Sequence, residues 1–409
     1  MSNPDGKVLL LSRQPLRSRP LQQWLGLKHS ANTVLLTTAA ALQGVEEEVL
    51  HSFAHIETVE HYQSWATELR AEQLARKFHV ERVASTSEMD VLRAARLRER
   101  LGLPGQSVPS AIAYRDKLLM RQLLQKAGVP IPAFSALDNP SDLLSFIERA
   151  NGPVVVKPRL GFASAAVSIL REEWDVTEFL NTEQSSSVPF LPGQWMVEEY
   201  VSGLFHHVDG LMRDGEVLHC YPSRYSGGLA ERVRQNKHLG SLMLDPVDSA
   251  AATLSALAAQ TVAALPSAPE ALAFHLEAWI RPDGSAIVCE IASRAGGGPI
   301  VQGYQKSFGV QLAHAGLLSQ YGDQIDIPAA PTPQPYTGWL MFSGTGEVFD
   351  PPPGDCPVPG VELKLSVERG EQTAVASDSS SAVATAVLSA DSHAELANRM
   401  VELERWWEN

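Results

Sequence analysis

Two glutamates on one predicted β-hairpin are the residues best placed to do chemistry in this sequence. Ala273–Ile291 predicts two apolar strands joined at Asp283-Gly284, a strong signal for a two-residue turn. With that turn Glu277 lies opposite Glu290, and facing side chains have Cβ atoms about 4.5–5.5 Å apart, where like charges repel. Such a pair needs a proton or a cation between its members, and ligands that are all oxygen suit Mg²⁺.

In this register the other side of the hairpin is wholly apolar, with the facing pairs Leu276 and Ile291, Ala278 and Cys289, and Ile280 and Ile287. A turn at Pro282-Asp283 would instead make the two glutamates diagonal neighbours on one face, and the same conclusion would hold. The competing interpretation is a solvated hairpin face with two unrelated glutamates. The segment alone does not decide between these interpretations.

A lysine ends another apolar strand. Pro153–Pro158 predicts a buried strand that carries Lys157, and the small residues Gly161, Ala163 and Ser164 follow it. Small residues let backbone N–H groups approach a phosphate, and lysine supplies a positive charge. The residue order is not that of a Walker A motif. The competing interpretation is an ordinary strand end.

A third predicted strand carries two adjacent acids. Within Trp195–Val201, Glu198 and Glu199 point to opposite faces of the strand. Burial of both acids without partners would be costly. We therefore expect one of them to be solvated and the other to meet a lysine or an amine; two solvated acids on an edge strand are the alternative.

The elements that position these residues begin with an alternation of strands and helices. Such alternation over the first 110 residues favours a parallel α/β layer, with strands expected at Lys7–Ser12, Asn32–Thr38, His55–Val59 and Val80–Ala84 and helices at Tyr62–Phe78 and Asp90–Leu101. Residues 116–128 predict a helix capped by Asp116. From residue 330 the chain turns to Pro-rich segments, short strands and a last amphipathic helix at His393–Trp407.

Composition excludes several classes of protein. The chain has 409 residues, of which 44% are apolar, as in globular proteins. A net charge of −14 argues against nucleic acid as a partner, because a phosphate backbone needs clustered cations. The three cysteines are far apart and suggest neither a disulfide framework nor a zinc site. With no signal-peptide or membrane-spanning pattern, we expect a cytoplasmic protein.

Taken in order, these segments resemble the ATP-grasp superfamily, and within it the carboxylate–amine ligases of the L-amino acid ligase type. The resemblance rests on RDKLLMRQLLQKAGVPIP (115–132), VVVKPRLGFASAAV (154–167), MVEEYVSG (196–203), HLEAW (275–279) and CEIASRAGGG (289–298). It implies an α/β and α+β chain with the ATP-grasp fold. The implied parts are a Rossmann-like domain at 1–110, a small lobe with the adenine hinge at 111–200, a large lobe with the metal site at 201–320, and a closing subdomain at 321–409.

The resemblance also implies the cofactors ATP and Mg²⁺, with Mn²⁺ as a substitute, and a role for each matching residue. Lys117 and Lys157 would hold phosphates, Ser164 would belong to the phosphate loop, Glu198 would lie by the adenine amine with the Val201 backbone at the ring edge, Glu277 and Glu290 would bind the metal, and Arg294 would stabilise the acyl phosphate or the substrate carboxylate.

Several positions depart from the family pattern. Ala292 stands where the family usually has a metal-binding asparagine, and Ala163 and Ala166 stand where glycines are common in the phosphate loop. No acid follows Gly203 to hold a ribose, so no ribose ligand is assigned; Asp209 is an ordinary strand residue in this interpretation. His206 and His207 lack further ligands at metal-binding spacing and are likewise interpreted as strand residues.

The implied activity is amide or peptide-bond formation between a small carboxylate and a small amine, with free amino acids preferred. ATP would phosphorylate the carboxylate, the amine would attack the acyl phosphate, and ADP and phosphate would leave. No membrane partner is implied, and a homodimer is left open. Two alternatives remain: an ATP-grasp carboxylase that uses bicarbonate, and a nucleotide-binding regulatory or scaffold protein without turnover. Ala292 and the altered phosphate loop support the second alternative.

Overall fold

The N-terminal part of the chain forms a parallel α/β layer. The computed structural model describes residues 6–162, 165–182, 191–226, 238–375 and 382–408. Its first sheet has the strand order β3-β2-β1-β4, and all pairs are parallel. Apolar side chains bury both faces of this sheet, as parallel strands between helices require. The expected Rossmann-like layer is confirmed, with strands β1 (Val8–Leu11), β2 (Thr33–Thr37), β3 (His55–Thr58) and β4 (Arg82–Ser85) and helices α1 (Leu21–Ala31), α2 (Glu47–His51), α3 (Trp65–Lys77), α4 (Glu88–Leu101) and α5 (Val108–Ala113).

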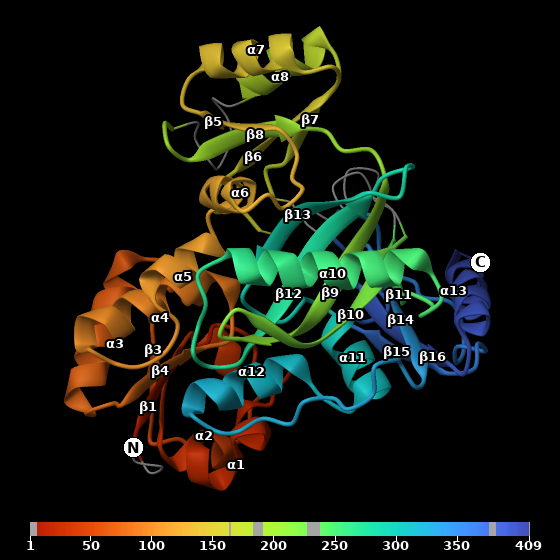
Figure 1. Cartoon of the computed structure of the whole chain (residues 1–409). Coiled ribbons are helices and arrows are strands. Elements are labelled where there is room, and N and C mark those ends of the chain that lie inside the picture. The colour runs from red at the N-terminus through yellow and green to blue at the C-terminus, as the bar shows by residue number, and fades with distance from the viewer. Residues whose placement is uncertain (1–5, 163–164, 183–190, 227–237, 376–381, 409) are drawn as a thin grey trace.

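A small lobe stands apart from the rest of the molecule, at the top of Figure 1. Its antiparallel sheet has the order β5-β8-β6-β7, and one face is covered by two helices. These elements are β5 (Phe134–Leu137), β6 (Val154–Pro158), β7 (Ser168–Leu170), β8 (Trp195–Glu199), α7 (Pro140–Arg149) and α8 (Glu173–Thr182). Helix α6 (Lys117–Lys126) leads into the lobe, and the side chain of Asp116 caps it as expected by accepting from the N–H groups of Leu118 and Leu119.

A large antiparallel sheet forms the remaining lobe. Its eight strands have the order β13-β12-β9-β10-β11-β14-β16-β15. They are β9 (Leu204–Arg213), β10 (Glu216–Tyr225), β11 (Leu239–Met243), β12 (Leu272–Ile280), β13 (Ala286–Ala292), β14 (Tyr336–Phe342), β15 (Val361–Leu365) and β16 (Ala384–Ala390). The last three strands continue the same sheet, so the sheet crosses the boundary expected at residue 320.

Helices cover the large sheet on both faces. Helix α10 (Ser249–Ala264) packs on the face that receives Leu276 and Phe274 from β12. Helices α11 (Ile300–Phe308) and α12 (Leu312–Tyr321) pack on the other face, and α13 (His393–Glu408) closes the C-terminal end. Since successive residues of a strand point to opposite faces, Ala273, His275 and Glu277 point away from α10. Helix α11 and strands β10 and β11 were not expected from the sequence.

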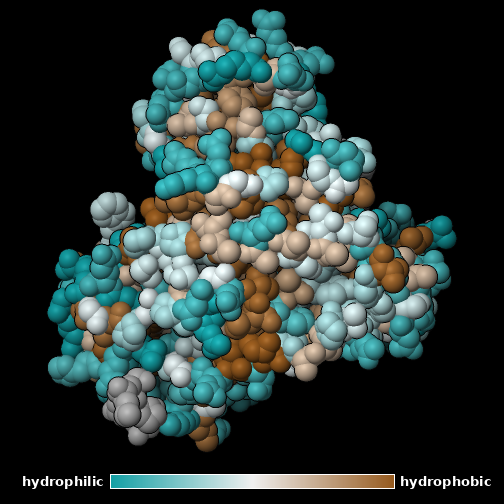
Figure 2. Space-filling view, viewed as in Figure 1, coloured by the Kyte–Doolittle hydropathy of each residue, from teal (hydrophilic) through white to brown (hydrophobic). Residues whose placement is uncertain are grey.

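The lobes meet at a narrow waist. Figure 2 shows apolar side chains gathered where the small lobe joins the large one. Within the described chain, no helix combines the length and the apolar character needed to cross a membrane.

Candidate active site

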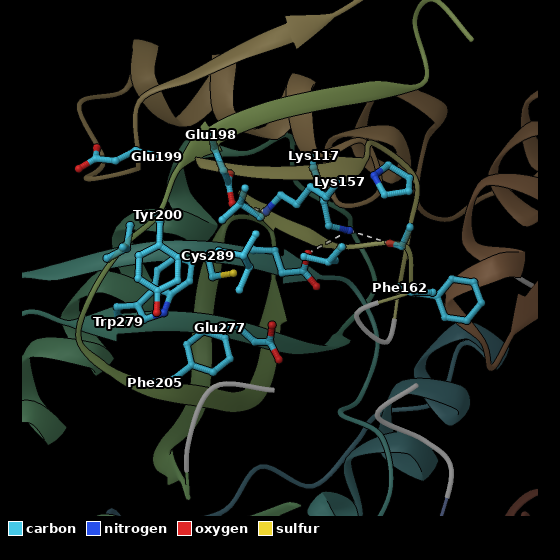
Figure 3. Close-up of a pocket in the computed structure, with 18 of the residues that line it drawn as sticks. Lys117, Lys157, Phe162, Glu198, Glu199, Tyr200, Phe205, Glu277, Trp279 and Cys289 are labelled. Carbon is cyan, nitrogen blue, oxygen red and sulfur yellow. Dashed lines mark hydrogen bonds and ion pairs between the residues drawn. The ribbon is translucent and has the colours of Figure 1, made fainter. Parts of the chain in front are cut away.

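The main cavity lies at this waist, between the two antiparallel sheets. It opens to solvent, and the empty space within it, including the part that is open, is about 1030 Å³. Figure 3 shows Lys117, Lys157, Glu198 and Glu277 around the same space, with Phe162 and Glu199 at its rim. The cavity therefore brings together six of the expected site residues. They are Lys117, Lys157, Glu198, Val201, Glu277 and Glu290.

The two glutamates on the hairpin face each other as expected, but the loop and the strand pairing that bring them together differ from the expected ones. The loop has three residues, because the N–H of Arg281 donates to the carbonyl of Ser285, and strand pairing resumes at Ile280 and Ala286. That loop would place Glu277 opposite Cys289. A β-bulge next to Glu277 restores the pairing of Glu277 with Glu290.

The expected facing pairs on the rest of the hairpin are therefore partly wrong. Ala278 faces Val288 and Ile280 faces Ala286, although Leu276 still faces Ile291. The reason is physical: the three-residue loop shifts the register by one residue, and the extra residue of the bulge shifts it back. As a result both Cys289 and Glu290, which are neighbours in sequence, line the cavity.

Lys117 connects the first turn of α6 to the hairpin of β12 and β13. Its ammonium lies 3.0 Å from a carboxylate oxygen of Glu290. It also donates a hydrogen bond of 2.6 Å to the carbonyl of Gly161, at the start of the loop after β6. The lysine thus joins three segments that are far apart in the sequence. Ser164, in the same loop, lies outside the described residues.

Glu198 is buried between two cations. Lys157 contacts one of its carboxylate oxygens at 2.5 Å, and Arg121 contacts the other at 2.9 Å. Burial disfavours ionisation of Glu198, but the charges of Lys157 and Arg121 outweigh it and lower the pKa of this carboxyl group. The expectation that one acid of this strand meets a lysine is met by Glu198, while Glu199 is about half exposed, with 45% of its side chain accessible.

Arg121 was not anticipated as part of the site. Its side chain is fully buried and donates a second hydrogen bond, of 2.6 Å, to the carbonyl of Cys289. This bond fixes the bulged residue to the helix that carries Lys117. The sequence held a signal, because Arg121 lies four residues after Lys117 on the same buried side of α6.

A buried hydrogen-bonded chain of side chains leads to Glu277. His207 contacts Asp209 at 2.5 Å, Asp209 contacts His275 at 2.9 Å, and His275 lies 3.4 Å from Glu277. The hydroxyl of Tyr225 donates to the same oxygen of Glu277 at 3.1 Å. Burial raises the pKa of Glu277, but the hydrogen bonds from His275 and Tyr225 outweigh it, so the pKa of this carboxyl group lies below its usual value.

These hydrogen bonds show that His207 and Asp209 are more than the ordinary strand residues they were interpreted to be. With His275 they form a buried group whose ligand atoms lie within 4.8 Å of one another. The nitrogen and oxygen atoms that face each other are already joined by hydrogen bonds, so the group holds Glu277 in place. The sequence held a signal for this contact. In a strand, residues two apart lie on the same face, and His275 lies two residues before Glu277.

Arg294, the expected catalytic residue, does not line this cavity; it lies beside the N-terminal domain. Its guanidinium contacts Glu88 at 2.6 Å, and Arg115 contacts the other oxygen of Glu88. Burial opposes ionisation of Glu88, but the charges of Arg294 and Arg115 outweigh it and lower the pKa of Glu88 to about 2. Glu88 begins α4, so the N-terminal domain holds the side chain expected to meet the substrate.

Aromatic rings form the end of the cavity away from the lysines. Tyr200, Phe205 and Trp279 line it there, and the rings of Phe205 and Trp279 lie 5.2 Å apart. A flat apolar wall of this kind suits a planar ring system. Phe205 lies in the segment directly after Gly203, where the sequence offers no acid to bind a ribose.

The sequence is 28% identical over 246 residues to an L-arginine-specific L-amino acid ligase of Bacillus subtilis, covering 59% of this chain and 58% of that protein. It is 24% identical over 278 residues to an alanine–anticapsin ligase of Bacillus subtilis, covering 63% and 57%. The chain thus matches less than two thirds of the length of these relatives. No family model matches the sequence.

Solved structures match over nearly the whole chain. An L-amino acid ligase from Bacillus licheniformis superposes with a TM-score of 0.73 at 16% identity, covering 99% of this chain and 98% of that one. A carboxyaminoimidazole ribonucleotide synthase from Aspergillus clavatus, crystallised with ATP, superposes with a TM-score of 0.70 at 14% identity, covering 99% and 100%. The chain has the ATP-grasp fold. The resemblance inferred from the sequence motifs, and the fold class inferred with it, are confirmed.

The donor set of this ATP-grasp chain fits a magnesium ion. Glu277 and Glu290 offer carboxylate oxygens from paired positions on adjacent strands, and Mg²⁺ is commonly bound by one or two carboxylates together with phosphate oxygens and water. Ala292, paired with His275 at the next position of the hairpin, supplies no further side-chain ligand. Two carboxylates would therefore hold the ion, one of them positioned by His275 and Tyr225 and the other beside Lys117.

Proposed function

We propose that the protein is an ATP-dependent carboxylate–amine ligase that joins two small substrates, preferably amino acids, through an acyl phosphate. The observation that carries this proposal is the pairing of Glu277 with Glu290 on the floor of a cavity that Lys117 and Lys157 also line. Two carboxylates and two ammonium groups around one cavity suit a nucleoside triphosphate and its metal.

The two ends of the cavity suit different parts of the nucleotide. The adenine would lie against Tyr200, Phe205 and Trp279, with the Val201 backbone at the ring edge and Glu198 near the amine. Lys117 and Lys157 would neutralise phosphate charge, and Glu277 and Glu290 would hold Mg²⁺, with Mn²⁺ as a substitute. Bound Mg²⁺ would supply charge neutralisation at the phosphates.

The chemistry needs positioning and charge rather than a protein nucleophile. The substrate carboxylate attacks the terminal phosphorus of ATP, ADP leaves, and the amine then displaces phosphate from the acyl phosphate. Arg294 would stabilise the oxyanion that forms when the amine attacks. Closure of the small lobe over the waist would exclude water, which otherwise hydrolyses the acyl phosphate.

The sequence relatives support this reaction class, since one is named as an L-arginine-specific L-amino acid ligase and another as an alanine–anticapsin ligase. The decisive experiment measures ADP and phosphate release by the purified protein with ATP, MgCl₂ and a panel of amino-acid pairs. Mass spectrometry of the same reactions should show a product whose mass is the sum of the two substrates less one water. ADP release without any condensed product, or no ADP release with any pair, would contradict the proposal.

A carboxylase reaction is the second candidate. An N5-carboxyaminoimidazole ribonucleotide synthase of Mycobacterium tuberculosis is 35% identical over 88 residues, which cover 20% of each chain. Repeating the assay with and without added bicarbonate separates the two candidates. Stimulation of ADP release by bicarbonate with no second carboxylate present would favour the carboxylase.

A further inference from the structure

The loop after β6 is fixed to the start of α6 by hydrogen bonds. The backbone N–H of Lys117 donates to the carbonyl of Arg159 at 3.0 Å, and the ammonium of Lys117 donates to the carbonyl of Gly161 at 2.6 Å. The carboxylate of Asp116 accepts from the guanidinium of Arg159 at 3.0 Å. Because Lys117 and Gly161 both line the main cavity, the position of this loop determines part of the cavity wall.

Arg115 connects the same loop to the N-terminal domain. Its guanidinium donates to the carbonyl of Leu160 at 2.8 Å and also contacts Glu88 at the start of α4. Arg115 is buried, with 7% of its surface exposed, and lies in the short connection between α5 and α6 (Figure 1). The rigid guanidinium has several donors, so one side chain can hold a carboxylate and a carbonyl in a fixed relation.

The other oxygen of Glu88 accepts from Arg294. The Nε and Nη2 atoms of Arg294 donate to this oxygen at 2.9 and 2.6 Å, and its Nη1 donates to the carbonyl of Ala295 at 2.9 Å. A substrate anion at Arg294 must therefore share the guanidinium with Glu88. Two anions side by side repel each other, and Arg115 is the second cation that offsets this repulsion.

A continuous series of contacts thus runs from the cavity wall to Arg294. It passes from the carbonyl of Leu160 through Arg115 and Glu88, and each link is a charge-assisted hydrogen bond. Arg115 contacts both of its partners while the loop and α4 keep their relative positions. A ligand that orders the loop therefore stabilises the arrangement of Glu88 and Arg294 as well, and such coupling between two sites is reciprocal.

We propose that Arg115 is a positioning residue that couples the nucleotide side of the site to Arg294. Nucleotide bound against the loop after β6 favours the arrangement of Glu88 and Arg294 that receives the substrate carboxylate. By reciprocity, the carboxylate favours nucleotide binding by the same factor. This inference rests on the proposed ligase function and adds to it a means by which the two substrates bind together.

The test measures amide hydrogen exchange with a nucleotide as the only ligand. Exchange of the full chain in MgCl₂ is followed by mass spectrometry with and without AMP-PNP, a non-hydrolysable ATP analogue. We expect AMP-PNP to slow exchange by at least about fivefold in residues 88–95, the first two turns of α4, although none of these residues lines the main cavity. Exchange in α3 of the same domain, which takes no part in this series of contacts, should stay unchanged.

Variants assign the effect to Arg115. Arg115→Met should reduce the slowing in residues 88–95 to less than about twofold, and Arg115→Lys should retain part of it because the charge remains. Glu88→Gln should give the same loss as Arg115→Met, and the double variant should lose no more, because all three interrupt one series of contacts. Arg100→Gln is the matched control, since Arg100 is an exposed residue of α4 that pairs with Glu72. It should leave the slowing unchanged.

The ratio of exchange rates without and with AMP-PNP separates coupling from a purely structural role. A residue that only stabilises the fold would change both rates by the same factor when replaced and would leave their ratio as in the wild type. Such an unchanged ratio in Arg115→Met would overturn the inference, and so would the absence of slowing in α4 while calorimetry shows AMP-PNP to be bound.

Parallel ADP-release assays keep this inference separate from the ligase proposal. Slowing that depends on Arg115, without turnover of any amino-acid pair, would support the coupling and contradict the ligase. Turnover together with no slowing in α4 would do the reverse. Failure of the wild type to bind AMP-PNP by calorimetry would contradict both.

Discussion

Glu277 and Glu290 face the same cavity although the loop between their strands has three residues. With regular pairing after that loop, Glu290 would point to the apolar face with Leu276. The bulge at Cys289 adds one residue and turns Glu290 back to the side of Glu277. Bulges re-aim side chains next to active sites in this way. The carbonyl of Cys289 accepts from Arg121, which holds the bulge in place.

Replacing either of the paired glutamates should abolish turnover while leaving the fold intact. In Glu290→Gln, loss of one charged ligand should lower the kcat/KM for ADP formation by at least about a hundredfold, because charge stabilisation by a metal contributes several kcal/mol. Glu216→Gln, a change at the exposed start of β10, is the matched control. Steady-state ADP assays at several MgCl₂ concentrations measure the effect; full activity of Glu290→Gln would remove the metal-site assignment.

Loss of the buried cation Arg121 should destabilise the protein. Arg121→Leu leaves the carbonyl of Cys289 and one side of Glu198 without their partner, and breaking a buried pair in this way costs about 3–5 kcal/mol. Urea unfolding followed by circular dichroism measures the loss. The double variant Arg121→Leu/Glu198→Gln should be less stable than Arg121→Leu, because it also leaves the buried ammonium of Lys157 without its carboxylate. Arg149→Leu, at the exposed end of α7, should change the free energy of unfolding by less than about 0.5 kcal/mol.

Asp209 should act on the metal site through His275. It contacts His275 at 2.9 Å, and His275 in turn lies beside Glu277, so Asp209→Asn should weaken Mg²⁺ or Mn²⁺ binding by about 10–100-fold. Binding of Mn²⁺ followed by electron paramagnetic resonance, with the nucleotide present, reports this directly. The matched control is the exposed Asp355→Asn. Unchanged affinity together with lost thermal stability would show a purely structural role for Asp209.

Stability in acid should depend on Glu88. Its pKa falls from an ordinary 4.5 to about 2, so the ion pairs with Arg294 and Arg115 stabilise the fold fully above pH 4.5. That contribution is lost as the pH falls from about 4.5 towards 2, and its full size is about 3 kcal/mol. Thermal unfolding of the wild type should therefore shift more steeply over this range than that of Glu88→Gln. Parallel profiles would contradict the assigned pairing.

Local patterns in the sequence predicted much of the fold and of the site. Hydrophobic periodicity placed the strands of the N-terminal sheet and the helix after Asp116 within a few residues, because these elements bury a regular stripe or run of apolar side chains. The hairpin pattern predicted that Glu277 and Glu290 face each other.

Contacts between distant segments could not be predicted in this way. Arg121 was hidden in an amphipathic helix, and nothing local to it shows that Glu198 and the carbonyl of Cys289 approach its guanidinium. The bulge at Cys289 was missed because two-residue and three-residue turns give the same apolar run. Glu88, in an otherwise ordinary helix start, meets Arg294 from 206 residues away.

The sequence by itself determined which residue types were available for chemistry and the order in which the elements follow one another, because both depend on short-range patterns. The tertiary structure decided which charges neutralise each other and which are left for a ligand. Those outcomes depend on distances of a few ångströms between lobes, where burial strengthens each charge–charge contact. For that reason Glu198 is held by Arg121 and Lys157, and Glu88 by Arg294 and Arg115.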